Sequence, residues 1–332
     1  MNATVLGCGS WGGTISQYLT TRGYAVKTWH KFEDEVAQML ENRKHPLLPD
    51  LTLDESIKIT SDLVESLVDA EILIVAVPSH IVRSVITEID DNILKNVIIV
   101  NLSKGIENDS LMTMSQVIAE SCIVSKDNIV SLYGPSHAEE VAKNMPTTLV
   151  SACTNLNTAK SVQSIFSSDI LRVYANSDIL GVELGGSLKN IIAVAAGICD
   201  GIGFGDNTKA ALITRGLTEI TRLGVKIGAK PDTFFGLSGI GDLIATCLSK
   251  HSRNRYVGEE IGKGRKLDDI LNHMKMVAEG VKTTVSVRQL RKKFEVTMPI
   301  SKAVDDVIFF GHDPEVAVSK LMTRDLREEK SY

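Results

Sequence analysis

The strongest structural signal in the first half of the chain is Ala3-Thr4-Val5-Leu6-Gly7-Cys8-Gly9-Ser10-Trp11-Gly12. It joins a short apolar strand signal to a Gly-x-Gly-x-x-Gly motif, and a helix signal, Gly12–Arg22, follows directly. In such a unit Gly7 allows the tight turn, Gly9 lets backbone approach a pyrophosphate, and Gly12 lets helix and strand pack closely. The N–H groups at the start of the helix attract phosphate. The stretch predicts a dinucleotide site, and an ordinary glycine-rich turn is the alternative.

Further strand and helix signals alternate through the first half of the chain. The strand signals are short, rich in Val and Ile, and apolar on both faces, which is typical of a parallel sheet covered by helices. They lie at Ala3–Leu6, Ala25–Trp29, Ile72–Val77, Val97–Asn101, Ile129–Tyr133, Thr148–Ser151 and Ile170–Tyr174, with helix signals such as Gly12–Arg22, Ile81–Ile89 and Thr158–Phe166 between them. This alternation predicts a doubly wound, Rossmann-like α/β domain over residues 1–177.

The pattern changes after Asn176, where strand signals nearly vanish and long helical windows take over. These windows are Ile179–Cys199, Thr208–Gly228, Arg255–Gly262, Leu267–His273, Thr283–Phe294, Ile300–Phe310 and Pro314–Leu321. Residues 178–332 are therefore predicted to form a second, all-helical domain, which makes the chain α/β plus all-α.

Composition argues against several classes of function. The chain has 332 residues, 43% hydrophobic and 23% charged, as in a globular protein of two domains. A net charge of −5 argues against a nucleic-acid partner, and the apolar run Ile191–Cys199 is less than half of a membrane span. Five scattered cysteines without a C-x-x-C pair indicate reduced thiols. We expect a cytoplasmic protein without membrane insertion, and the histidine spacing predicts no metal site.

The end of the second strand signal bears on the choice of cofactor. NAD-specific sites usually carry Asp or Glu at this point to hold the ribose hydroxyls, whereas sites that accept NADP carry a basic or neutral group. Here the strand signal ends in Thr28-Trp29-His30-Lys31. Lys31 therefore permits NADP as well as NAD, and a solvated lysine is the alternative.

Later strand signals also end in polar residues, and ligands of open α/β sheets bind beyond such ends. Lys104 follows the strand signal that ends at Asn101, and it could meet a cofactor or substrate or lie in solvent. Gly134, Ser136 and Ala138 follow the strand signal that ends at Tyr133. Ser136-x-x-Glu139 has the spacing of a capping box, which would start a helix at the ligand edge.

Lys189 lies inside the first long helical window of the second half. Leu180, Leu184, Leu188 and Ile192 form the apolar stripe of this window, and Lys189 lies off the stripe. Its neighbours one turn away, including Gly185 and Gly186, are small and would leave space for a ligand. Close helix packing is the alternative for the glycines, and a solvated ammonium is the alternative for Lys189.

A polar cluster follows in the second half. Asp242 stands among small and apolar residues, and Ser252-Arg253-Asn254 offers several donors that could grip a phosphate. A solvated loop is the alternative for this string. Val277-Ala278-Glu279-Gly280 interrupts the helical pattern and could be a simple turn.

In order along the chain, these segments resemble the bacterial-type NAD(P)-dependent glycerol-3-phosphate dehydrogenases. Matching stretches are Gly7–Gly12, Val77–His80, Ser103–Gly105, Gly134–Ser136, Leu184–Asn190, Asp200–Gly205, Gly239–Leu243 and Ser252–Asn254. The resemblance implies a helical second domain like the C-terminal domain of 6-phosphogluconate dehydrogenase, and a homodimer. Two departures are Ser136-His137, where the family often carries Thr-Phe, and the variable residue at Lys31.

The resemblance also implies a role for each matching residue. Lys189 would be the catalytic acid/base. The substrate, dihydroxyacetone phosphate or glycerol 3-phosphate, would lie among Lys104, Gly134, Ser136, Lys189, Asp242, Ser252, Arg253 and Asn254. NADP or NAD would contact Gly7, Gly9, Ser10, Trp11, Gly12, Lys31, Lys104, Ala138, Arg253, Val277 and Glu279.

The expected function is reversible reduction of dihydroxyacetone phosphate to sn-glycerol 3-phosphate, which would supply glycerophospholipid synthesis. A dehydrogenase acting on another small hydroxy acid is an alternative. A catalytically silent dinucleotide sensor is another, but a sensor would need the glycine motif without Lys189, Asp242 and Arg253 together.

Overall fold

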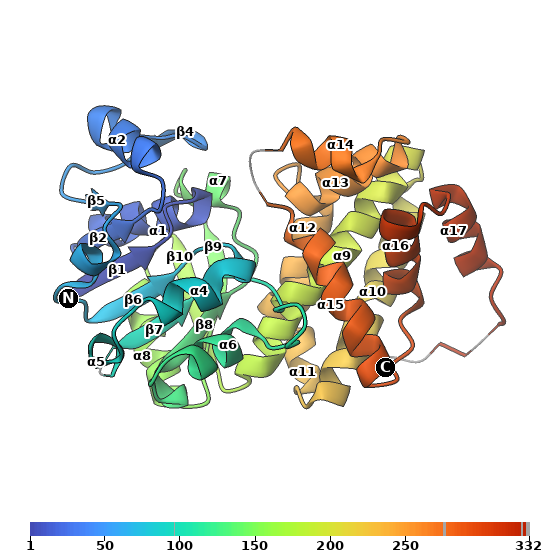
Figure 1. Cartoon of the computed structure of the whole chain (residues 1–332). Helices are drawn as coiled ribbons and strands as arrows, with labels where there is room; N and C mark the ends of the chain where they lie inside the picture. The colour runs from blue at the N-terminus through green and yellow to red at the C-terminus, as the bar shows by residue number, and fades with distance from the viewer. Residues whose placement is uncertain (96, 275–276, 327, 330–332) are drawn as a thin grey trace. The chain divides into compact units, whose positions relative to one another are not determined.

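A computed structural model describes residues 1–95, 97–274, 277–326 and 328–329 (Figure 1). The chain forms two compact units: unit 1 comprises 1–104 and 114–179, and unit 2 comprises 105–113 and 180–332. The sequence analysis placed 105–113 in the first domain, but these residues pack with unit 2. The Ser187 hydroxyl donates to the Gly105 carbonyl (3.2 Å), and the Ser286 hydroxyl donates to the Ile106 carbonyl (3.0 Å).

Unit 1 is built on an eight-stranded sheet in the order β10-β9-β8-β7-β6-β1-β2-β5. The strands are β1 (Asn2–Leu6), β2 (Ala25–Trp29), β5 (Lys58–Thr60), β6 (Ile72–Val75), β7 (Ile98–Asn101), β8 (Ile129–Tyr133), β9 (Thr147–Ala152) and β10 (Leu171–Asn176). From β8 to β5 every neighbouring pair is parallel, in the doubly wound order typical of dinucleotide-binding folds. The Rossmann-like prediction is confirmed.

Helices cover this sheet, and their apolar faces bury its Val and Ile side chains. They are α1 (Ser10–Thr21), α2 (Glu33–Asn42), α3 (Leu63–Leu67), α4 (Val82–Thr87), α5 (Asp91–Leu94), α6 (Met114–Ser121), α7 (Ala138–Val141) and α8 (Leu156–Phe166), with short 3₁₀ turns at Ser79–Ile81 and Lys126–Asn128. In Figure 1, α4 and α6 lie side by side over the sheet.

The sequence patterns missed part of this sheet. β9 runs antiparallel to β8, so the sheet is mixed rather than wholly parallel. The short strand β5 and the small hairpin of β3 (Lys44–His45) and β4 (Leu48–Thr52) were not predicted. Strands of two or three residues carry too little alternation to stand out in a sequence, and strand direction is a tertiary property.

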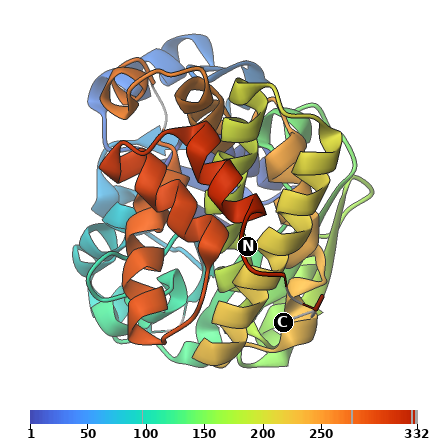
Figure 2. The same cartoon turned by 90° about the vertical axis from the view of Figure 1, so that its right-hand side faces the viewer.

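Unit 2 is helical, as predicted (Figure 2). Its helices are α9 (Ile179–Ile202), α10 (Asp206–Ile227), α11 (Pro231–Phe234), α12 (Asp242–Leu248), α13 (Arg253–Gly262), α14 (Leu267–Asn272), α15 (Glu279–Lys293), α16 (Pro299–Phe310) and α17 (Pro314–Met322). The sequence patterns missed α11, α12 and a π-helical turn at Leu237–Gly241, because each is short. In Figure 2 the yellow α10 stands beside the orange and red C-terminal helices.

α9 forms the centre of unit 2. Every residue from Gly181 to Cys199 is buried, and the other helices of the unit pack around it. Among the described residues α9 is the one helix long and apolar enough to cross a membrane, with 89% of its apolar window buried. Such burial is typical of a core helix.

Candidate functional site

The polar residues predicted in unit 1 share one edge of the sheet. Leu6 at the end of β1 pairs in register with Trp29 of β2 and with Val75 of β6, and Val75 pairs with Asn101 of β7. Because these strands are parallel, the loops that follow them all start at the same edge. The glycine loop, Lys31, Lys104 and the segment after β8 therefore surround the place where open α/β sheets bind ligands.

The glycine loop has the geometry that its motif predicts. Gly7 has φ +100° and donates its N–H to the Trp29 carbonyl at 2.9 Å. A Cβ on Gly12 would lie 1.8 Å from the Gly7 carbonyl oxygen, so only glycine allows α1 to start this close to β1. A Cβ on Gly9 would meet nothing within 4 Å, which leaves open space beside the loop backbone. Ser10 and Trp11 begin α1 and are half-buried.

Lys31 is exposed just beyond β2. Lys104 is half-buried, and its Nζ donates to the Gly134 carbonyl at 2.9 Å and lies 5.7 Å from the centre of the Tyr133 ring. These contacts exclude a purely solvated Lys104. They bring it together with Gly134, which has φ +149°.

The predicted capping box is wrong. His137 is the N-cap residue of α7 and makes no side-chain cap, and the Ser136 hydroxyl donates instead to the Gly134 carbonyl at 3.2 Å. Ala138 is buried at the start of this four-residue helix. A Ser-x-x-Glu spacing identifies a capping box only where the backbone places the serine at the N-cap, and here the helix begins one residue later.

In unit 2 the structure joins two residues that are far apart in the sequence. Lys189 is 6% exposed, and its Nζ donates to Asp242 Oδ1 at 2.6 Å and to the Thr246 hydroxyl at 2.5 Å. Asp242 is 2% exposed and is the first residue of α12. This buried ion pair excludes a solvated Lys189.

Thr246 was missed by the sequence analysis. It lies one helical turn after Asp242 and donates its hydroxyl to the Asp242 carbonyl at 2.7 Å. An i, i+4 spacing from an already selected acid was the signal that could have found it, since such residues share a helix face.

The small residues beside Lys189 serve packing. A Cβ on Gly185 would lie 2.7 Å from the Ser238 carbonyl oxygen, so the π-helical turn at Leu237–Gly241 fills the space expected for a ligand there. Single-turn π-helices often occur at functional sites. This one leads directly into Asp242.

Ser252, Arg253 and Asn254 begin α13 rather than forming a loop. The Ser252 hydroxyl caps the helix by accepting from the Arg255 N–H at 3.2 Å, and the adjacent Arg253 is exposed. The Asn254 amide donates to Asn190 at 2.9 Å, beside Lys189. At this end of α13, Arg253 is therefore exposed, whereas Ser252 and Asn254 on either side of it are buried.

Asn254 also holds the segment that was predicted to touch the cofactor. Its side-chain oxygen accepts from the Gly280 N–H at 2.8 Å, in the first turn of α15. Glu279 is the first residue of this helix, and the half-buried Val277 precedes it by two positions. The interpretation of this segment as a simple turn is therefore wrong.

Paired glycines set the distance between α9 and α13. A Cβ on Gly197 would lie 1.9 Å from the Arg255 carbonyl oxygen, and one on Gly258 would lie 2.0 Å from the Val194 carbonyl oxygen. Gly201 and Gly262 repeat the contact one turn further on. The helix of Lys189 and the helix of Arg253 therefore touch through their backbones.

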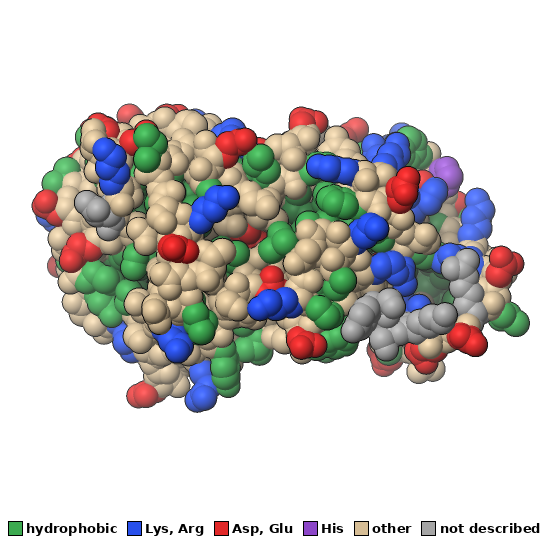
Figure 3. All heavy atoms as spheres, turned by 90° about the horizontal axis from the view of Figure 1, so that it is seen from below, with side chains coloured by type: hydrophobic (Ala, Val, Ile, Leu, Met, Phe, Trp, Pro, Cys, Tyr) green, Lys and Arg blue, Asp and Glu red, His purple; other side chains and the backbone are tan. Residues whose placement is uncertain are grey.

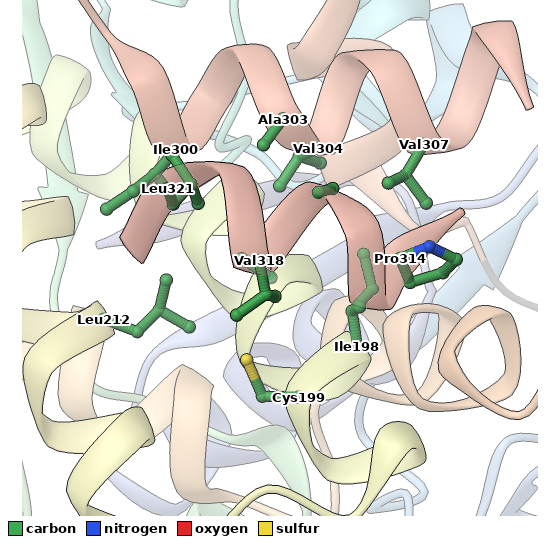
Figure 4. Close-up of a pocket in the computed structure, with 12 residues that line it drawn as sticks. Ile198, Cys199, Leu212, Ile300, Ala303, Val304, Val307, Pro314, Val318 and Leu321 are labelled. Carbon is green, nitrogen blue, oxygen red and sulfur yellow. The ribbon is translucent and has the colours of Figure 1, made fainter. Parts of the chain in front are cut away.

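A small cavity of about 40 Å³ in unit 2 has a different character (Figure 4). Residues of α9, α10, α16 and α17 line it, including Cys199, Leu212 and Val318, and all lining residues are apolar. None of the predicted site residues lines it. Within the described ranges, no group of three or more His, Cys, Asp or Glu side chains could hold a metal ion.

The features of this fold and site are together typical of one kind of enzyme. NAD(P)-dependent dehydrogenases typically combine two such features. One is a doubly wound sheet with a glycine loop for a dinucleotide, and the other is a helical unit that buries a lysine against a carboxylate. Comparisons with known proteins narrow this class.

Residues 2–159 match the profile of the NAD-dependent glycerol-3-phosphate dehydrogenase N-terminus, and residues 178–319 match that of its C-terminus. Glycerol-3-phosphate dehydrogenase [NAD(P)+] of Prosthecochloris aestuarii is 52% identical over 99% of this chain and 100% of its own length. The crystal structure of glycerol-3-phosphate dehydrogenase from Coxiella burnetii superposes with a TM-score of 0.92, at 35% identity over 97% of this chain and 99% of that one. The chain belongs to the NAD-dependent glycerol-3-phosphate dehydrogenase family.

Proposed function

We propose that this chain reversibly reduces dihydroxyacetone phosphate to sn-glycerol 3-phosphate with NADH or NADPH, and that Lys189 is its catalytic acid/base. The observation that carries the assignment of Lys189 is its burial against Asp242 and Thr246. An ammonium held in this place, with little access to bulk water, can donate its proton directly to a reacting group that enters beside it. Family membership supports the choice of substrate and cofactors.

The chemistry needs a proton at one oxygen. When bound, the nicotinamide supplies a hydride to the carbonyl carbon, and negative charge then develops on the substrate oxygen. The Lys189 ammonium stabilises this charge and donates its proton, while Asp242 and Thr246 hold the amine in place. In the reverse direction the neutral amine accepts the proton from the alcohol.

Other residues recognise the substrate phosphate and the cofactor. The exposed Arg253 at the start of α13, with Ser252 and Asn254 beside it, offers charged and polar donors for a phosphate. The further substrate residues of this proposal are Lys104, Gly134 and Ser136.

On the cofactor side, the start of α1 receives the pyrophosphate. The cofactor residues of this proposal are Gly7, Gly9, Ser10, Trp11, Gly12, Lys31, Lys104, Ala138, Arg253, Val277 and Glu279. Lys31, exposed two residues beyond β2, permits NADPH because its ammonium can pair with a 2′-phosphate.

The physiological role follows from the product. Glycerol 3-phosphate is the backbone of glycerophospholipids, so ketone reduction in the cytoplasm, by a homodimer as the family resemblance implies, supplies their synthesis. A catalytically silent sensor of dinucleotides would bind NADH equally well but would have no use for the buried Lys189–Asp242 pair.

The test follows the absorbance of NADH and NADPH with dihydroxyacetone phosphate as substrate. We expect Lys189→Met to lower kcat by roughly 10²–10⁴ while NADH still binds, because the proton donor is lost. This substitution also leaves the Asp242 carboxylate buried without its cation, which costs about 3–5 kcal/mol of folding free energy.

The double variant Lys189→Met/Asp242→Asn controls for that loss. It removes the stranded charge, so it should regain stability but not activity. A folded single or double variant that reduces the ketone at near the wild-type rate would refute the role of Lys189, and NADH binding without turnover by the wild type would favour the sensor.

A further inference from the structure

His45 is a buried histidine to which neither the sequence analysis nor the proposed mechanism gives a role. It ends the two-residue strand β3, and it is 1% exposed. The hairpin of β3 and β4 places its ring against the glycine loop, where its Nε2 lies 3.1 Å from the Cys8 carbonyl oxygen.

The hydrogen bonds around the ring determine its tautomer. The Leu47 N–H donates to His45 Nδ1 at 3.1 Å, so Nδ1 is an acceptor and carries no proton. The proton of the neutral ring therefore lies on Nε2, which donates it to the Cys8 carbonyl. Each ring nitrogen thus has a different and necessary role.

The fit of the ring to the loop depends on a glycine outside the Gly-x-Gly-x-x-Gly motif. A Cβ on Gly13 would lie 2.5 Å from Cδ2 and 2.8 Å from Nε2 of His45. Any larger residue at position 13 would push the ring off the loop. Gly13 also donates its N–H to the Gly9 carbonyl at 2.8 Å, so the ring and the first turn of α1 hold the same piece of backbone.

The bond to Cys8 orients the peptide that should meet the cofactor. The peptide between Cys8 and Gly9 is trans, and in a planar trans peptide the C=O and N–H point in opposite directions. Because His45 holds the Cys8 carbonyl, the Gly9 N–H points away from the histidine ring. Gly9 has open space beside it, since an added Cβ would meet nothing within 4 Å.

We propose that His45 is a positioning residue of the dinucleotide site, which in its neutral form holds the Cys8–Gly9 peptide so that the Gly9 N–H faces the pyrophosphate. This proposal rests on the proposed cofactor site. It adds to that site a residue, His45, that lies outside the Gly-x-Gly-x-x-Gly motif. Backbone N–H groups aimed at phosphate bind best when they need no reorientation on binding.

The proposal also predicts a pH dependence of cofactor affinity. Burial lowers the pKa of His45 below its usual value of 6.5, and the backbone hydrogen bonds to Cys8 and Gly9 oppose this shift. His30 and Glu35 are the titratable groups that interact with the ring. Protonation would put a hydrogen on Nδ1 against the Leu47 N–H, so the held geometry is lost as the pH falls through this lowered pKa, which lies below 6.5. Above this lowered pKa, His45 should make no contribution to the pH dependence of cofactor affinity.

Two matched substitutions separate the two ring nitrogens. The amide nitrogen of Gln reaches the position of Nε2, so His45→Gln keeps a donor to Cys8. The side-chain oxygen of Asn reaches the position of Nδ1, so His45→Asn keeps the acceptor for Leu47 and loses the donor. Neither side chain titrates.

The experiment measures the Kd of NADH by fluorescence for the wild type and both variants between pH 5 and pH 8. NADH is the probe because it lacks the titrating 2′-phosphate of NADPH. At pH 7.5 we expect His45→Asn to weaken binding about 3- to 10-fold, as for one lost hydrogen bond, and His45→Gln to stay within about twofold. As the pH falls through the lowered pKa of His45, the wild type should lose affinity relative to His45→Gln, in which all other groups still titrate.

Three outcomes would overturn the proposal: equal affinity for the two variants at pH 7.5, no loss of wild-type affinity relative to His45→Gln over the pH range in which ¹⁵N NMR shows the His45 ring to take up its second proton, or a ¹⁵N NMR spectrum of the neutral ring with the His45 proton on Nδ1. The NMR and pH measurements need no His45→Asn protein, so they decide the matter even if that variant fails to fold. Failure of the wild type to bind NADH at all would instead contradict the proposed function.

Discussion

Single side chains in this protein do their work through partners far away in the sequence. Lys189 and Asp242 form a buried ion pair from two different helices, and Thr246 completes the contacts of the amine. A buried pair of this kind adds little net stability, because the cost of removing two charges from water nearly offsets their attraction. Its presence at the centre of unit 2 is therefore better explained by chemistry than by folding.

Arg253 allows a sharp prediction at this scale. Arg253→Ala should raise KM for dihydroxyacetone phosphate about 10- to 150-fold, because a charged hydrogen bond to phosphate contributes about 1.5–3 kcal/mol. Steady-state kinetics with phosphorylated and unphosphorylated ketone would measure this, and wild-type enzyme should use dihydroxyacetone poorly.

Arg265→Ala is the matched control for Arg253. Arg265 is exposed three residues after the end of α13, and its guanidinium pairs with Glu260 at 2.7 Å. The loss of this guanidinium should leave KM unchanged. Equal rates with the two ketones, or equal KM values for the two variants, would remove Arg253 from the phosphate site.

At the scale of elements, contact between backbones decides where the site residues lie. α9 carries Lys189 and α13 begins with Arg253, and glycines at 197, 201, 258 and 262 let the two helices touch. Asp200 adds an ion pair across this contact, with Arg255 Nε at 2.6 Å. Small residues spaced four apart on both helices are a recurrent means of bringing helices this close.

Replacement of one of these glycines should force the helices apart. In Gly258→Ala the new Cβ would lie 2.0 Å from the Val194 carbonyl oxygen, and backbone cannot yield as a flexible side chain does. We expect a loss of about 3 kcal/mol in the free energy of unfolding, measured by urea denaturation, despite the better helix propensity of alanine.

Gly241→Ala, in the π-helical turn before α12, is the matched control for Gly258→Ala. The nearest atom to its new Cβ lies at 3.7 Å, an ordinary contact, so its stability should change little or rise. A Gly258→Ala protein as stable as Gly241→Ala would show that the two helices are free to adjust.

At the scale of the whole molecule, each unit has its own apolar core, and the surface mixes charges of both signs. Figure 3 shows lysine and arginine side chains scattered among aspartate and glutamate on the visible face, in keeping with a net charge of −5. The five cysteines are free, and four of them are buried. Burial raises the pKa of Cys8 and Cys247 to about 12 and that of Cys122 and Cys199 to about 11.

The cysteines therefore report on global unfolding. Because the thiolate is the reactive form, native protein at pH 7.5 should react with iodoacetamide at least about 100-fold more slowly than protein in denaturant. The half-buried Cys122 should react first, and all five should react after unfolding, as mass spectrometry would show. Rapid alkylation of Cys8 in the native protein would contradict the buried, closed glycine loop.

Features that depend on a few neighbouring residues could be predicted from the sequence. The strand–glycine loop–helix unit, the alternation that builds the doubly wound sheet and the long helices of the second half all follow from local pattern and backbone chemistry. Lys189, Asp242 and Arg253 could be selected because they stand in distinctive local surroundings and because the ordered segments resemble a known family. Their roles remain predictions.

The folded structure was needed to show which remote segments meet. It paired Lys189 with Asp242, placed 105–113 in unit 2 and turned β9 antiparallel to β8. It also seated His45 on the glycine loop, from a strand too short to be seen in the sequence. Contacts of this kind depend on the summed packing of many residues rather than on any one segment, so no local pattern encodes them.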